Sequence, residues 1–372
     1  MRYYIIAGEA SGDLHASNLM KEIKVRDPEA EFRCWGGDRM QARGGEIVKH
    51  YRDLAFMGYI QVILNLRTII GNLRFCKEDI LQFNPDAVIL VDYPGFNLRI
   101  AKFAHQQNLK VFYYISPQLW AWKKSRVKKI KKYVDRMFVI LPFEKEFYQK
   151  YKIDVDFVGH PLLDAIPPRA ESLSKADFID QHKLDERQII ALLPGSRKQE
   201  IGTMLKVMLK MIPVFTDFQF VIAGESSIPT EFYNKIIGNS QVTVAYGQLA
   251  DLLYNSKVAL VTSGTATLET ALIGTPEVVC YKAATFSYLI AKMIVDVKHI
   301  SLVNLIMDRE IVKELVQFDF TAKNLEKELD ILLGKQDYRK QMMQNYADLN
   351  EKLGGHGASA KTAELMIQAL GK

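Results

Sequence analysis

A short apolar run, followed by small residues and then by a helical pattern, occurs twice in the second half of this chain. The run at 189–193 leads into the turn PGSR (194–197), and the run at 258–262 leads into the turn SGT (263–265). Apolar runs of this length are typical of strands that are buried on both faces of a parallel sheet. The chain is therefore expected to contain βα units, with each turn at the carboxyl end of its strand.

The residue types in these two turns point to an anionic ligand. Small residues let a ligand approach the backbone, and the N–H groups at a helix start attract negative charge. Arg197 adds a planar cation suited to phosphate, and Glu269 can accept hydrogen bonds from a sugar hydroxyl. The turns predict a nucleotide diphosphate site made of Ser196, Arg197, Ser263, Gly264, Thr265 and Glu269. Ordinary turns with a surface arginine are the alternative, and neither a P-loop nor a Gly-x-Gly-x-x-Gly motif is present.

The whole chain repeats the same alternation of strands and helices. Strands are expected at 3–7, 87–91, 111–115, 136–140, 189–193, 219–223, 242–245, 258–262 and 277–281. Because 372 residues exceed one ordinary domain, an α/β fold with two doubly wound Rossmann-like domains is expected. Prolines in 161–188 mark the connection. We predict domains at 1–165 and 166–340, followed by C-terminal helices at 341–372 that return to the first domain if the fold analogy holds.

Acidic residues follow two strands of the first half. Asp92 ends the run at 87–91, where partial burial would raise the pKa of its carboxyl group and suit it to act as a general base. Its alternative role is to cap the next helix. Glu9, Ser11 and Asp13 follow the first strand and are predicted to face acceptor hydroxyl groups, with helix capping as the alternative.

Composition and charge exclude several classes of protein. The chain is 48% hydrophobic and 25% charged with a net charge of +6, which indicates globular domains. Three widely spaced cysteines predict neither a disulfide framework nor a metal cluster, and they fit a reducing cytoplasm. We expect no metal and no cofactor. The N-terminus leads directly into a strand, and no apolar run is long enough for a membrane span, so neither a signal peptide nor such a span is expected.

Two segments suggest contact with a membrane surface. Residues 54–75 are apolar around much of a helix, and Ile60, Ile63 and Leu66 are the predicted patch; residues 123–132 contain seven Lys or Arg. Together they could bind anionic lipid headgroups. A buried core helix and a solvated basic helix are the alternatives. The basic segment contains no interleaved aromatic residue, which argues against nucleic acid as the partner.

Eight motifs, in order along nearly the whole chain, resemble one family. They are AGEASGDLH (7–15), VDYPGFN (91–97), SPQLWAW (116–122), LPFEKEFY (141–148), VGHPL (158–162), LLPGSR (192–197), SGTATLE (263–269) and SLVNLIMDREIVKELVQ (301–317). The chain resembles the lipid-A-disaccharide synthases, which are inverting glycosyltransferases of the GT-B type with two Rossmann-like domains facing a cleft. The resemblance is specific because SPQLWAW occurs together with LPFE, VGHP and LLPGSR in one chain.

The resemblance implies a reaction and assigns roles to residues. UDP-2,3-diacylglucosamine would condense with 2,3-diacylglucosamine 1-phosphate (lipid X) to give lipid A disaccharide 1-phosphate and UDP, a step of lipopolysaccharide synthesis. Asp92 matches the candidate base, Arg197 the diphosphate ligand, Glu269 the ribose ligand, and Asn304 an asparagine near the donor. Gly95 stands where some members carry a second acidic residue, so a base assigned there cannot apply here. Val303 replaces a proline that commonly precedes Asn304, so the geometry of that loop stays open.

Acylated substrates imply a peripheral enzyme at the cytoplasmic face of the inner membrane, and a homodimer is possible. The alternative enzyme is another UDP-sugar-dependent GT-B protein, such as a UDP-GlcNAc 2-epimerase or a transferase with a soluble acceptor. A nucleotide-sugar sensor or a basic nucleic-acid-binding protein is the alternative without catalysis.

Overall fold

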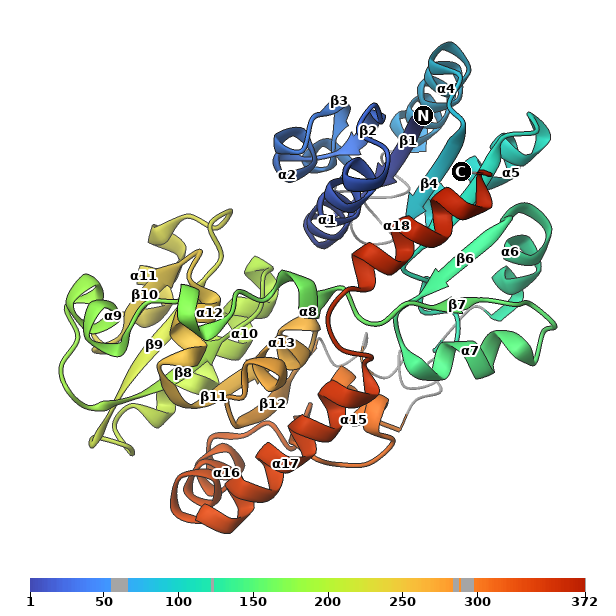
Figure 1. Ribbon diagram of the computed structural model, residues 1–372. Helices are drawn as coiled ribbons and strands as arrows, with labels where there is room; N and C mark the ends of the chain where they lie inside the picture. The colour runs from blue at the N-terminus through green and yellow to red at the C-terminus, as the bar shows by residue number, and fades with distance from the viewer. Residues whose placement is uncertain (55–65, 122–123, 284–287, 289–297, 372) are drawn as a thin grey trace. The chain divides into compact units, whose positions relative to one another are not determined.

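A computed structural model describes residues 1–54, 66–121, 124–283, 288 and 298–371 (Figure 1). The chain forms two compact units: Met1–Ala165 with Leu353–Lys372, and Ile166–Lys352. Each unit contains one parallel sheet with helices packed against it, which confirms the predicted α/β class with two doubly wound domains. The chain leaves the first unit after Ala165 and returns at Leu353, so residues 341–352 belong to the second unit.

The first unit contains a seven-stranded sheet in the order β3-β2-β1-β4-β5-β6-β7, with parallel pairing between neighbours. Its strands are β1 (Arg2–Ala7), β2 (Glu31–Gly36), β3 (Gly45–His50), β4 (Ala87–Val91), β5 (Lys110–Tyr114), β6 (Arg136–Val139) and β7 (Asp156–Phe157). Strands β1, β4, β5 and β6 lie close to the predicted positions. The sequence pattern missed β2, β3 and β7.

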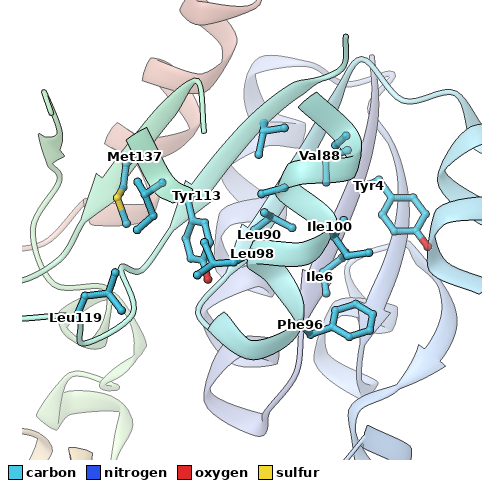
Figure 2. Packing of buried hydrophobic residues seen from close by; sticks show 14 of the residues in the cluster. Tyr4, Ile6, Val88, Leu90, Phe96, Leu98, Ile100, Tyr113, Leu119 and Met137 are labelled. Carbon is cyan, nitrogen blue, oxygen red and sulfur yellow. The ribbon is translucent and has the colours of Figure 1, made fainter. Parts of the chain in front are cut away.

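Helices cover both faces of this sheet. The apolar layer that packs side chains of β1, β4 and β5 against α5 is shown in Figure 2. The helices of the unit are α1 (Ala10–Arg26), α2 (Asp38–Ala42), α4 (Leu66–Phe83), α5 (Pro94–Gln106), α6 (Val127–Tyr133), α7 (Pro142–Gln149), α8 (Leu162–Ala165) and α18 (Ala358–Ala369), with short 3-10 turns at η1 (Tyr51–Leu54) and η2 (Lys124–Arg126).

The C-terminal helix α18 packs beside α1 in the first unit (Figure 1). The Asp164 carboxylate accepts hydrogen bonds from the backbone N–H groups of Gly357, at 2.6 Å, and Ser359, at 2.9 Å. The Arg136 guanidinium donates to the Leu365 carbonyl at 3.1 Å. These bonds attach the end of the chain to segments about 200 residues earlier in the sequence.

The second unit has a six-stranded sheet in the order β10-β9-β8-β11-β12-β13. Its strands are β8 (Gln188–Leu193), β9 (Phe218–Gly224), β10 (Thr243–Tyr246), β11 (Ser256–Thr262), β12 (Glu277–Tyr281) and β13 (Lys313–Val316). Its helices are α9 (Lys175–His182), α10 (Lys198–Met208), α11 (Thr230–Ile237), α12 (Leu249–Tyr254), α13 (Thr265–Ile273), α15 (Leu302–Met307), α16 (Ala322–Gly334) and α17 (Gln336–Lys352), with 3-10 turns at η3 (Arg169–Glu171) and η4 (Leu209–Met211). Five of its six strands match the predicted positions, and β13 was missed.

The strand order reverses at one place in each sheet. In the first sheet β1 lies beside β4, and in the second β8 lies beside β11. Ligands of such sheets bind outside the carboxyl ends of the strands at this switch point. The turns after these four strands, together with the helices that they lead into, hold every predicted site residue except Asn304 and the membrane patch.

Candidate functional site

Asp92 lies in an unusual turn between β4 and α5. Both Asp92 and Tyr93 have left-handed backbone conformations, with φ of 42° and 46°. Residues other than glycine seldom adopt this conformation, and where they do the site is often functional. The residue Asp92 as a whole is exposed to solvent, but its carboxyl group has many protein atoms around it and is partly desolvated. This desolvation, aided by the Glu9 charge, raises the pKa of Asp92 to about 6.

The turn after β1 brings its three predicted residues to the same switch point, but in different states. Glu9 and Ser11 are exposed at the start of α1. Asp13 is buried, and its carboxylate accepts hydrogen bonds from the N–H groups of Gly37, Arg39 and Met40 at 2.7–3.2 Å. Asp13 therefore holds the start of α2, while Glu9 and Ser11 are free to face a ligand.

A second buried carboxyl group follows β6. Glu144 accepts hydrogen bonds from the N–H groups of Ile140 and Leu141 at 3.2 and 3.0 Å and so satisfies two backbone donors at the start of α7. Burial raises the pKa of Glu144 to about 7. The hydroxyl groups of Ser116 and Tyr148 form a hydrogen bond of 2.8 Å. The motifs SPQLWAW and LPFEKEFY, which contain these residues, therefore contact each other in a buried polar cluster that includes Glu144.

In the second unit, the turn after β8 presents Arg197 at the N-cap of α10. The guanidinium is 60% exposed and forms an ion pair with Glu200 at 3.1 Å. Gly195 has φ of 105°, and a Cβ atom there would come within 2.9 Å of the Glu200 carboxylate, so glycine suits this position on both counts. Glu200 was not among the predicted site residues, although its spacing of three residues from Arg197 on a helix indicated the pair.

The turn after β11 lies beside the turn after β8. A Cβ atom on Gly195 would be 3.6 Å from Thr262, the last residue of β11. Gly264 and Thr265 are exposed at the start of α13, and the Ser263 hydroxyl donates to the Ile300 carbonyl at 2.9 Å. The starts of α10 and α13 thus lie at neighbouring strand ends, as expected for a site that holds an anion.

Glu269 lies in the second turn of α13 and is half-buried. Burial raises the pKa of its carboxyl group to about 7. Among the residues that the structure describes, no hydrogen-bond donor or cation pairs with this carboxylate. A half-buried carboxylate without a protein donor is well suited to accept hydrogen bonds from a ligand.

Asn304 differs from the other predicted residues because its side chain is completely buried in α15. Its amide nitrogen donates to the Val312 carbonyl and the Glu314 carboxylate, both at 2.9 Å. Its amide oxygen accepts from the N–H groups of Ile311, at 2.7 Å, and Val312, at 3.0 Å. In this arrangement the side chain has no surface for a ligand, and Asn304 holds the segment that leads to β13.

The predicted membrane patch is only partly within the described chain. Ile60 and Ile63 lie outside the described residues, and Leu66 is the first residue of α4. Within the described residues, no helix is long and apolar enough to cross a membrane. The same described residues contain no group of three or more His, Cys, Asp or Glu that could hold a metal ion.

Comparison with known proteins gives matches over almost the entire chain. The family model of lipid-A-disaccharide synthetase matches residues 3–368. The lipid-A-disaccharide synthase of Acidobacterium capsulatum is 38% identical over 98% of this chain and 96% of its own length. That of Syntrophus aciditrophicus is 38% identical over 99% of this chain and 97% of its own length.

Solved structures share the fold at much lower identity. A putative UDP-N-acetylglucosamine 2-epimerase from Listeria monocytogenes has a TM-score of 0.67 at 14% identity and covers 99% of this chain and 96% of its own. The glycotransferase of kitacinnamycin has a TM-score of 0.66 at 12% identity, with 99% of each chain covered. These likenesses confirm the predicted GT-B fold.

Proposed function

This chain belongs to the lipid-A-disaccharide synthetase family, and we propose that it joins UDP-2,3-diacylglucosamine to 2,3-diacylglucosamine 1-phosphate with release of UDP. The observation that carries this proposal is the opposite chemistry of its two switch points. One presents the Asp92 carboxylate, and the other presents Arg197 and two helix starts. A glycosyl transfer needs a base for the acceptor and a cation for the departing diphosphate.

In the proposed mechanism, the acceptor lies at the first switch point with its 6-hydroxyl near Asp92. Asp92 removes the hydroxyl proton as the oxygen attacks the anomeric carbon of the donor. The bond between that carbon and the diphosphate oxygen breaks, and the configuration at the carbon inverts. A carboxyl group with a pKa of about 6 is ionised near pH 7 and is still basic enough to accept the proton.

The donor is proposed to lie at the second switch point. Arg197 and the N–H groups at the starts of α10 and α13 stabilise the charge that develops on the UDP leaving group. The diphosphate is lined by Ser196, Ser263, Gly264 and Thr265. The ribose hydroxyl groups donate hydrogen bonds to Glu269.

We also propose that the first unit docks on the cytoplasmic face of the inner membrane. Helix α5 packs against both α4 and α6. Exposed cations on these helices are Arg67, Arg74, Arg99, Lys102, Lys128, Lys129, Lys131 and Lys132. Ile70 and Phe75, on α4, expose 58% and 44% of their surface. A basic surface with exposed apolar residues suits anionic lipid headgroups and would deliver an acylated acceptor.

The reaction is tested with purified protein, both diacylated substrates and detergent. We expect equal amounts of UDP and of a disaccharide 1-phosphate that carries four acyl chains. If neither product forms, the proposal is wrong. If UDP forms with a deacylated acceptor as readily as with the acylated one, the transferase with a soluble acceptor is favoured instead.

The docking surface is tested by vesicle flotation. Binding to phosphatidylglycerol vesicles should exceed binding to phosphatidylcholine vesicles and should weaken as salt increases. Replacing Lys128, Lys129 and Lys132 with glutamine should reduce binding to the anionic vesicles. The matched control replaces Lys323, Lys327 and Lys335 of the second unit, which are also exposed. Equal binding by both variants would contradict this surface.

A further inference from the structure

The left-handed turn at Asp92 requires support from its surroundings. Two consecutive residues other than glycine hold positive φ at Asp92 and Tyr93. Such a conformation persists only where neighbouring groups stabilise it. The groups that contact this turn therefore decide where the Asp92 carboxylate lies.

Asn97, on the first turn of α5, is the main support. Its side chain is completely buried. Its amide nitrogen donates to the Asp92 carbonyl at 2.8 Å and the Val91 carbonyl at 3.2 Å, with a longer contact of 3.5 Å to the Ile6 carbonyl. Its amide oxygen has no hydrogen-bond partner among the described residues. The carboxamide therefore acts as a donor that ties the turn to the ends of β1 and β4.

Two further contacts hold the turn from β5 and β1. The Tyr113 hydroxyl donates to the same Asp92 carbonyl at 2.5 Å. Figure 2 shows Tyr113 packed beside Leu90 and Leu98 in the apolar layer beneath α5. Gly8 leaves room for the Tyr93 ring, because a Cβ atom at Gly8 would come within 2.4 Å of that ring.

We propose that Asn97 is a positioning residue for Asp92 and that Tyr113 is the second donor in this role. Together they fix the Asp92 carbonyl, and with it the left-handed conformation that presents the carboxylate at the switch point. Without the two donors, the residue can relax to negative φ and move its carboxylate away from an acceptor hydroxyl. This inference rests on the proposed function, in which Asp92 takes the proton of the acceptor.

A double-mutant cycle tests whether Asn97 acts through Asp92. Turnover is measured for the wild type, Asn97→Ala, Asp92→Asn and the double variant. We expect Asn97→Ala to lower kcat by about 30-fold, with little change in the KM for the UDP-sugar. The double variant should be no slower than Asp92→Asn alone. If the double variant instead shows the product of the two single-variant losses in kcat, Asn97 supports only the fold, and the proposal is wrong.

Tyr113→Phe removes one donor and preserves the packing of the ring. It should lower kcat by about threefold, whereas Tyr114→Phe, its buried neighbour on the same strand, should leave kcat unchanged. Equal effects of the two variants would contradict the role of Tyr113.

An NMR titration of the Asp92 carboxyl group provides a readout that does not depend on turnover. Asn97→Ala should lower the pKa of Asp92 from about 6 toward its ordinary value, because the relaxed carboxylate gains water. An unchanged pKa would overturn the inference. An inactive wild-type protein would instead refute the proposed function, and this titration would still decide the role of Asn97.

Discussion

The two switch points of this protein share a strand order but differ in charge and in backbone conformation. At β1 and β4 the exposed groups are the carboxylates of Glu9 and Asp92, and Asp92 is held in a left-handed turn. At β8 and β11 the turns lead into helix starts, and the exposed side chain of Arg197 adds a positive charge. The topology supplies two equivalent positions at the carboxyl ends of the strands, and the residues of each turn decide which charge that position presents.

The largest effect is expected at the acidic switch point. Asp92→Asn removes the proposed base and should lower kcat by about 10³-fold. The affinity for UDP should stay unchanged, because the second switch point keeps its groups. Turnover is measured by product formation and UDP affinity by calorimetry.

Asp86→Asn is the control, because Asp86 is an aspartate of the same unit that accepts a hydrogen bond from the Arg2 N–H at 2.7 Å. It should keep near-normal turnover. Near-normal turnover of Asp92→Asn as well would remove Asp92 from the role of base and would break the contrast between the two switch points.

The next effect is expected at the cationic switch point. Arg197→Ala should lower kcat/KM by about 10²-fold, because a charge-assisted contact to the leaving diphosphate is lost. Unlike Asp92→Asn, this variant should also bind UDP more weakly. Calorimetry and steady-state kinetics measure the two effects.

Arg187→Ala is the matched control. Arg187 is an exposed arginine of the same unit and, like Arg197, pairs with a carboxylate, that of Asp185 at 2.7 Å. It lies at the opposite end of β8, and its guanidinium also donates to the carbonyls of Thr216 and Phe218. If the two variants lose similar amounts of kcat/KM and of UDP affinity, the cause is the lower net charge of the protein rather than a lost contact to the diphosphate.

A smaller effect is expected for Glu269, the acidic group within the cationic site. Glu269→Gln should raise the KM for the UDP-sugar by about tenfold with little change in kcat, since one hydrogen bond to a charged acceptor is weakened. Donor-saturation kinetics test this prediction. A fall in kcat at unchanged KM would instead assign Glu269 to the chemical step.

The sequence predicted those parts of the fold and site that depend on local pattern. Apolar runs identified β4, β8 and β11, and small residues after them identified the turns. The pattern missed β2 because charged residues interrupt it; Arg33 is accommodated there by its ion pair with Asp79, at 2.7 Å. The burial of Asn304 could not be foreseen either, since its bonds to Val312 and Glu314 depend on how α15 packs against β13.

The smallest expected effect concerns Glu9, whose charge helps to raise the pKa of Asp92 to about 6. Because the base must be ionised, kcat/KM of the wild type should be constant above this pKa and should fall with decreasing pH below it. Glu9→Gln removes a like charge, lowers the pKa of Asp92 and moves this decline to lower pH. A like charge at several ångströms in water is worth less than about 1 kcal/mol, so the gain below pH 6 should be at most about fivefold.

Ser11→Ala, an exposed neighbour without charge, should leave the pH of the decline unchanged. A decline that does not move in Glu9→Gln would mean that desolvation alone sets the pKa of Asp92, and that the acidic switch point acts through one carboxylate rather than two.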